Sequence, residues 1–131
     1  MEFPEDVKYT REHEWVLVEE NTATVGITDY AQDQLGEIVY VELPSVGDKV
    51  SKGDAFAVVE SVKTVSDIYA PVSGTVVEVN EDLPDNPTLV NEDPYGDGWI
   101  VRIEMTDTTE LDDLLTAEEY QAYIAEEEEA E

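Results

Sequence analysis

Apolar and polar residues alternate along most of the chain in short runs, and turn residues separate these runs. Alternation over about four to eight residues is typical of a strand with one buried face, while glycine, proline and asparagine mark turns. The pattern predicts strands at residues 15–18, 22–27, 38–43, 55–62, 65–70, 74–79 and 99–104, with a short strand beginning at Val50. The turn 19–21 joins the first two into a hairpin.

One short helix is predicted after this hairpin. Thr28 or Asp29 can cap its N-terminus, and Gly36 would end it after Leu35. Later in the chain, residues 80–98 contain three prolines and two glycines. We therefore expect a long loop between the last two strands.

Two short helices are predicted to close the chain. The capping box Thr116-x-x-Glu119 begins the second of them. Their apolar positions are Leu111, Leu114 and Leu115 on one face of the first, then Tyr120, Tyr123 and Ile124 on the second. Residues 125–131 form an acidic tail, which we expect to be loose from Glu126 to Glu131.

An internal repeat relates the two halves of the strand pattern. A shift of 38 residues superposes three pairs: Ile27 on Val65, Asp29 on Asp67 and Gly36 on Gly74. The same shift brings the strand 38–41 onto 76–79. Two quasi-symmetric β halves follow, neither of which could bury a core alone. The predicted class is mainly β, with a short internal helix and a helical C-terminal segment.

Charge and length narrow the classes of function. The chain has 131 residues, which suits one domain of the usual size, about 100 to 200 residues. Its 34 acidic and 6 basic residues give a net charge of -28, which disfavours nucleic acid and anionic membranes as partners. The acids are dispersed and 41% of residues are hydrophobic, so we expect a folded domain with an acidic surface. This composition leads to the hypothesis of a halophilic source and salt-dependent folding.

Independent catalysis has little support in the sequence. Cysteine is absent and His13 is the single histidine, which leaves little room for nucleophilic or zinc chemistry, and we expect His13 to be structural. The segment 91–102 has Arg102 where a calcium loop needs glutamate. The longest uncharged stretch, Ile68–Val77, is far shorter than the roughly 18 residues of a membrane span, and no basic leader is present, so a cytoplasmic location is expected.

Lys63 stands out because the chain has only four lysines. It lies between the predicted strands 55–62 and 65–70, at the tip of a hairpin. A lone turn lysine is most often simply solvated, but the two-halved β domain around it changes the interpretation. The arrangement resembles the biotinyl/lipoyl carrier domain, a flattened barrel or hybrid sandwich in which a lysine on an exposed hairpin is acylated by the cofactor.

Separated motifs make the resemblance more specific. The methionines usual beside a biotinyl lysine and the Asp-Lys-Ala usual in lipoyl domains of 2-oxoacid dehydrogenases are both missing. The chain is instead similar to the H proteins of the glycine cleavage system, in segments 12–15 (Glu-His-Glu-Trp), 25–32, 35–36, 41–44, 60–80 and 94–99. The resemblance covers about residues 7–124, so we expect residues 1–131 to be a single lipoyl-carrier domain with that core.

The resemblance implies a non-catalytic shuttle. Lipoate would be attached as N6-lipoyl-lysine at Lys63, within the hairpin context of Glu60, Ser61, Val62 and Thr64. Glycine decarboxylase would load an aminomethyl group, aminomethyltransferase would remove it, and dihydrolipoyl dehydrogenase would reoxidise the arm. A lipoyl-attaching enzyme is the fourth expected partner.

The resemblance also implies a docking place for the loaded arm. Glu14, Asp67 and the backbone around Glu12 would surround the docked amine, because an ammonium that leaves water needs carboxylate and carbonyl acceptors. Other readings stay open at this point: a lipoyl donor or acceptor in lipoate metabolism without a role in glycine cleavage, an unmodified acidic interaction module, a biotin carrier, and, least supported, an enzyme.

Overall fold

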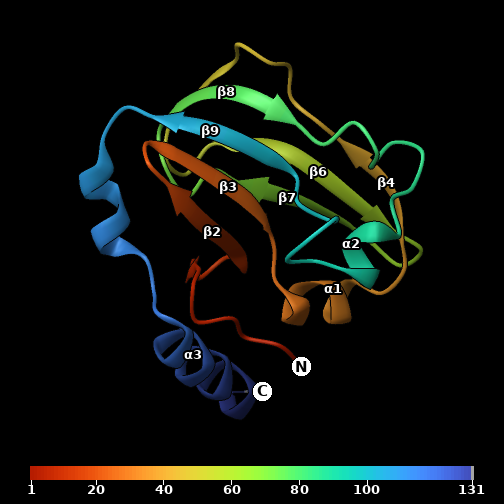
Figure 1. Cartoon of the computed structure of the whole chain (residues 1–131). Coiled ribbons are helices and arrows are strands. Elements are labelled where there is room, and N and C mark those ends of the chain that lie inside the picture. The colour runs from red at the N-terminus through yellow and green to blue at the C-terminus, as the bar shows by residue number, and fades with distance from the viewer. Residues whose placement is uncertain (131) are drawn as a thin grey trace.

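The computed structural model describes residues 1–130, within which nine strands form two antiparallel sheets that face each other (Figure 1). The larger sheet has the order β1 (Lys8–Tyr9), β2 (Glu14–Glu19), β3 (Thr22–Ile27), β9 (Val101–Met105), β8 (Gly74–Val79) and β5 (Lys49–Val50). The smaller sheet has the order β4 (Ile38–Glu42), β6 (Ala55–Ser61) and β7 (Val65–Tyr69). The mainly β class expected from the sequence is confirmed.

Helical segments lie at the ends of the sheets. They are α1 (Asp29–Leu35), α2 (Leu89–Glu92), the 3-10 helix η1 (Thr108–Asp113) and α3 (Ala117–Ala130). Figure 1 shows α1 and α2 side by side at one end of the sheets and α3 on the outside, next to the N-terminal strands. None of the helices within residues 1–130 is long and apolar enough to cross a membrane.

Two hydrophobic clusters hold these elements together. The larger lies between the sheets, with Val25, Val101 and Ile103 from one sheet and Val41, Val59 and Ile68 from the other. The smaller packs α3 against β1 and β2, and the rings of Tyr9 and Tyr120 stack there with centroids 4.6 Å apart. Burial of apolar surface is the main stabilising term in both, so each sheet has an inner face committed to packing.

The expected caps of α1 are present. The side-chain oxygen of Thr28 accepts a hydrogen bond from the backbone N–H of Ala31 at 3.1 Å, which confirms Thr28 rather than Asp29 as the N-cap. Gly36 ends the helix with a φ of 83°, a conformation that glycine adopts at little cost. These two residues fix where α1 begins and ends.

The prediction of one helical face for Leu111, Leu114 and Leu115 is wrong. The helix η1 ends at Asp113, and Leu114 is extended. Leu114 packs in the larger cluster and Leu115 in the smaller one, where Leu115 and Tyr9 also exchange backbone hydrogen bonds of 2.7 and 2.8 Å. The chain passes between the two clusters here, so adjacent leucines point in opposite directions.

Two other predictions need correction. The helix α3 continues to Ala130, so the expected loose tail is wrong for residues 126–130, while Glu131 lies outside the described residues. Glutamate and alanine favour helix, and the predicted capping box is confirmed: Thr116 N–H donates to Glu119 Oε1 at 2.9 Å, and Glu119 N–H donates to Thr116 Oγ1 at 3.2 Å. The predicted loop 80–98 contains the single turn α2.

Candidate functional site

The turn between β6 and β7 presents Lys63 in a fixed backbone geometry. Ser61 N–H donates to the carbonyl of Thr64 at 2.8 Å, and the Ser61 hydroxyl oxygen accepts from the N–H groups of Lys63 and Thr64 at 3.2 and 3.1 Å. Val62 N–H donates to the carbonyl of Glu37 at 3.1 Å, which ties the turn to the body of the molecule. Ser61 is buried, while Val62, Lys63 and Thr64 are exposed.

The Lys63 side chain lies over the end of α1. A Cβ placed on Gly36 would come 3.2 Å from Lys63 Cε and 3.9 Å from Nζ, so a side chain at Gly36 would press against the lysine. No salt bridge to Lys63 is present among the side chains of residues 1–128. The amine is therefore accessible, although its aliphatic stem contacts the body. Sequence reasoning missed this contact; the only sign of it was that Gly36 recurs in the repeat.

A cavity of about 260 Å³ lies beside this contact. Its lining includes Ala31, Gln34 and Leu35 of α1, Ser66 of β7, and Glu12 with His13 ahead of β2. Leu35 directly precedes Gly36, and Ser66 is three residues from Lys63. A flexible group attached to Lys63 would therefore find this cavity next to its anchor.

Glu14 is buried next to β7, with a relative exposure of 2%. Its carboxylate accepts hydrogen bonds from the Thr10 hydroxyl at 2.6 Å and from the backbone N–H of Tyr69 at 3.2 Å. Burial raises the pKa of Glu14 to about 7, although both hydrogen bonds act in the opposite direction. Glu14 is therefore a buried acid and not a solvated one. No salt bridge to its carboxylate is present among the side chains of residues 1–128.

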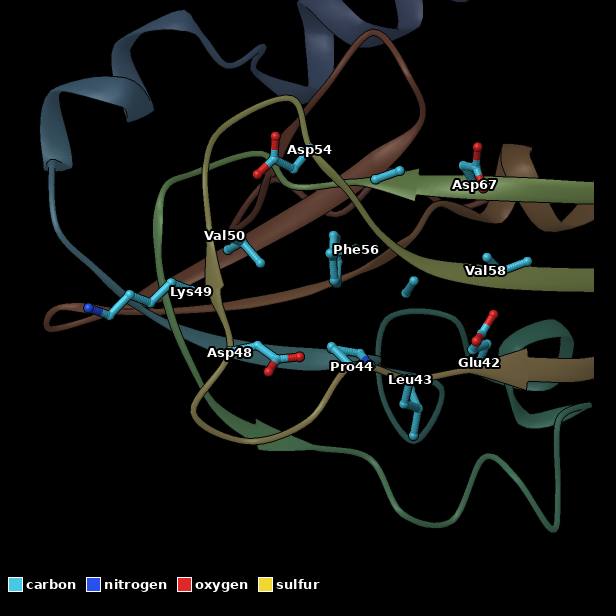
Figure 2. A pocket seen from close by; sticks show the side chains of 12 residues that line it. Glu42, Leu43, Pro44, Asp48, Lys49, Val50, Asp54, Phe56, Val58 and Asp67 are labelled. Atoms are coloured by element: carbon cyan, nitrogen blue, oxygen red, sulfur yellow. The ribbon is translucent and has the colours of Figure 1, made fainter.

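The other two predicted docking residues lie apart. Glu12 is exposed and lines the 260 Å³ cavity. Asp67 is exposed too, but it lines a different cavity, of about 500 Å³, which Figure 2 shows together with Val58 and Glu42 on the neighbouring strands. Since successive strand residues face opposite ways, Ser66 lines the cavity with Glu12 and Asp67 points away from it. The three carboxylates do not surround one cavity.

His13 serves as a connector in the structure. Its Nδ1 lies 2.9 Å from the hydroxyl of Tyr120, which also lies 2.7 Å from the hydroxyl of Thr28, and its Nε2 lies 3.3 Å from a carboxylate oxygen of Glu127. Burial lowers the pKa of His13, while the Glu127 carboxylate acts in the opposite direction. These contacts join the segment just before β2 to the cap of α1 and to α3, which is the structural role expected for this histidine.

Asn91 holds the end of α1 through three side-chain hydrogen bonds. This role was not predicted from the sequence. Asn91 Nδ2 donates to Gln32 Oε1 at 3.0 Å and to the carbonyl of Gly36 at 2.8 Å, while its Oδ1 accepts from Ile38 N–H at 2.9 Å. One side chain of α2 therefore fixes the connection between α1 and β4. That connection contains both Gly36 and Glu37, which contact the Lys63 turn.

Several known proteins resemble this chain in both sequence and fold. A family model described as glycine cleavage H-protein matches residues 7–127. The chain belongs to the H-protein family. Its relatives include a glycine cleavage system H protein of Carboxydothermus hydrogenoformans, 58% identical over 124 residues that cover 95% of each chain.

Other members of the H-protein family agree with this assignment. One from Staphylococcus haemolyticus is 58% identical over 126 residues, 96% of this chain and 100% of the relative. The crystal structure of a glycine cleavage system H protein from Mycobacterium marinum superposes with a TM-score of 0.87 at 42% identity, and covers 93% of this chain and 98% of that one. The lipoyl-type fold expected from the sequence is thereby confirmed.

Proposed function

We propose that this chain is the lipoate-bearing shuttle of a glycine cleavage system. It would carry the aminomethyl group from glycine decarboxylase to aminomethyltransferase and electrons to dihydrolipoyl dehydrogenase, with no catalytic activity of its own. The observation that carries the proposal is Lys63, exposed at the tip of a turn that backbone and Ser61 hydrogen bonds hold, in a chain that the H-protein family model matches over residues 7–127. Residues 1–131 would act as one carrier domain with its core at about 7–124.

The residues around Lys63 fit an amide-linked lipoyl group. The amine is exposed and unbridged among the side chains of residues 1–128, so an attaching enzyme could reach it. The dithiolane of lipoate supplies a redox couple and sulfur atoms that carry the one-carbon unit. The protein contributes an anchor at Lys63, within the turn of Glu60, Ser61, Val62 and Thr64.

We further propose that the 260 Å³ cavity receives the loaded arm. Leu35 and Ala31 offer it apolar contact, and Glu12 lies on the cavity wall. Glu14 does not itself line this cavity. We expect it to pair with the amine when the arm docks, because a buried carboxyl with a pKa near 7 and no salt bridge among the side chains of residues 1–128 gains most from a neighbouring ammonium. The role of Asp67 stays a prediction from the family resemblance.

Two wider proposals concern the source and the location of the protein. The excess of acid supports a source adapted to concentrated salt, in which screening reduces self-repulsion within a chain of net charge -28. The expected cytoplasmic location stays a prediction.

The test is an intact mass and a peptide map of the protein from its native source. We expect an increment equal to one lipoyl group, located on Lys63, and none in the matched variant Lys63→Arg. A biotinyl increment would redirect the function to carboxylases. No increment, from cells shown to lipoylate other proteins, would contradict the proposal.

A further inference from the structure

The smaller sheet has an outer face on which most side chains are exposed. Its inner face supplies Val41, Val59 and Ile68 to the core. The opposite face carries two rows of residues that run across the three strands: Tyr40–Glu60–Val65 and Glu42–Val58–Asp67. The first row lies next to the Lys63 turn, since Glu60 and Val65 are the residues on either side of Ser61–Thr64.

Exposed apolar side chains concentrate on this face and its turn. In the described part of the chain, five of the nine exposed large hydrophobic residues belong to β4, to β7 or to the turn between β6 and β7. They are Val39, Tyr40, Val62, Val65 and Tyr69. Tyr40 is 51% exposed, Val65 60% and Val62 69%. Acidic residues occur all over this chain, whereas exposed apolar side chains form such a grouping only here among the residues whose burial is described. A grouping of this kind is typical of an interaction surface.

The second row leads into a groove. The 500 Å³ cavity of Figure 2 is lined in part by apolar side chains, among them Leu43, Phe56 and Val58. Four carboxylate side chains, those of Glu42, Asp48, Asp54 and Asp67, line it against one cation, Lys49. A complementary surface would therefore present basic side chains set among apolar ones.

We propose that this outer face, from the Lys63 turn to the groove, is the docking surface for the enzyme that attaches lipoate to Lys63, and that this enzyme meets it with lysine or arginine side chains set among apolar ones. The inference rests on the proposed function. It adds the surface and the chemistry of the partner.

The place of the reaction favours the attaching enzyme over the other partners. Attachment takes place at Lys63 Nζ, and the lysine stem lies within contact distance of Gly36. An active site that reaches this atom also approaches Val62 and Val65, which flank Lys63 in the chain, and Val65 belongs to the first row. Enzymes that act on the dithiolane work at the far end of the arm, so they can stand further from this face.

The test measures initial rates of lipoylation of the full unmodified chain by intact mass, with the chain at varied concentration, the attaching enzyme at catalytic concentration and its acyl donor saturating. The variant Tyr40→Ala/Glu42→Gln removes one apolar anchor and one charge, both exposed and outside the arm cavity. We expect its KM as substrate to rise about tenfold with kcat unchanged, as for the loss of one interface anchor. The matched control Val77→Ala/Glu104→Gln changes exposed residues of the other sheet and should keep the original KM.

A single charge reversal gives an independent check. Glu42→Lys places a cation opposite the basic partner, so its KM should exceed that of Glu42→Gln, and the difference should shrink as salt is raised. An unchanged KM in the double variant and in Glu42→Lys would overturn the docking surface. An unchanged KM together with weaker binding to glycine decarboxylase would assign the face to that enzyme instead. If the unaltered chain gains no lipoyl group at Lys63, the proposed function fails, and not merely the docking surface.

Discussion

Glu14 shows how far a single residue could be understood from sequence. Glu14 was predicted as a docking residue only from the family resemblance, because nothing in the sequence distinguishes it from the other acids among the 34. Its burial depends on Thr10 and on Tyr69, which is 55 residues away, so only the folded chain brings its partners together. Lys63 differs, since its turn is local and the flanking strands predict it. Local geometry was thus predictable, and long-range desolvation was not.

The raised pKa of Glu14 predicts a pH dependence of stability. A carboxyl whose pKa rises from 4.5 to about 7 on folding stabilises the fold below about pH 4.5, and that contribution disappears as pH rises through 7. Against Glu14→Gln, the wild-type chain should therefore lose up to about 3 kcal/mol of unfolding free energy between pH 4.5 and 8. Urea titrations at fixed salt measure the difference. Glu12→Gln controls for the loss of one charge, and an equal pH trend in that variant would contradict the assignment to Glu14.

The same side chain should protect the loaded arm. In Glu14→Ala, the aminomethyl group should be released about tenfold faster or more, because its ammonium loses a charge-assisted partner. The rate of release from the loaded chain measures this. Glu104→Ala, on the exposed surface of β9, should leave the rate unchanged. A release rate in Glu14→Ala equal to that of the original chain would contradict the pairing of Glu14 with the amine.

At the scale of elements, the sequence predicted what local signals encode. The cap Thr28, the stop at Gly36 and the capping box at Thr116 all form as expected. The single turn α2 was missed, since four residues between prolines carry no helical period. Its place is set by Asn91 and its contacts with α1 and β4. A tertiary network of this kind leaves no pattern along the chain.

Asn91 should therefore matter more than its half-exposed position indicates. Asn91→Ala leaves the carbonyl of Gly36 and the N–H of Ile38 without their partner, and we expect a loss of about 2 kcal/mol in unfolding free energy. Urea unfolding measures it. The exposed Asn86→Ala in the same connection is the control. Equal stability of the two variants would show that Asn91 does not support α1.

At the scale of the whole molecule, the strands were predicted but their order was not. The adjacent pair β3 and β9 is separated by about 80 residues, and packing of the core sets this partnership rather than a turn signal. The repeat found in the sequence matches β4 with β8, which lie in different sheets. Each sheet thus supplies one of the two matched strands.

Net charge predicts a salt dependence that belongs to the entire surface. The charge of -28 repels itself, and the screening length falls from about 10 Å at 0.1 M salt to about 3 Å at 1 M. We expect the urea midpoint of unfolding to rise as KCl is raised between these concentrations. The folded fraction of the chain, measured by circular dichroism without urea, should rise as well. An uncharged osmolyte at equal osmolality is the control. Full structure with the same midpoint in dilute buffer would count against adaptation to salt.

The hydrogen bond between Val62 N–H and the carbonyl of Glu37 has a consequence for transport. It anchors the carrying turn to the body, so the swinging radius of a group on Lys63 is set by the side chain and its attached arm, not by motion of the loop. A docked enzyme then experiences a local concentration of the carried group that depends on arm length alone. A looser turn would dilute the same cargo over a larger volume.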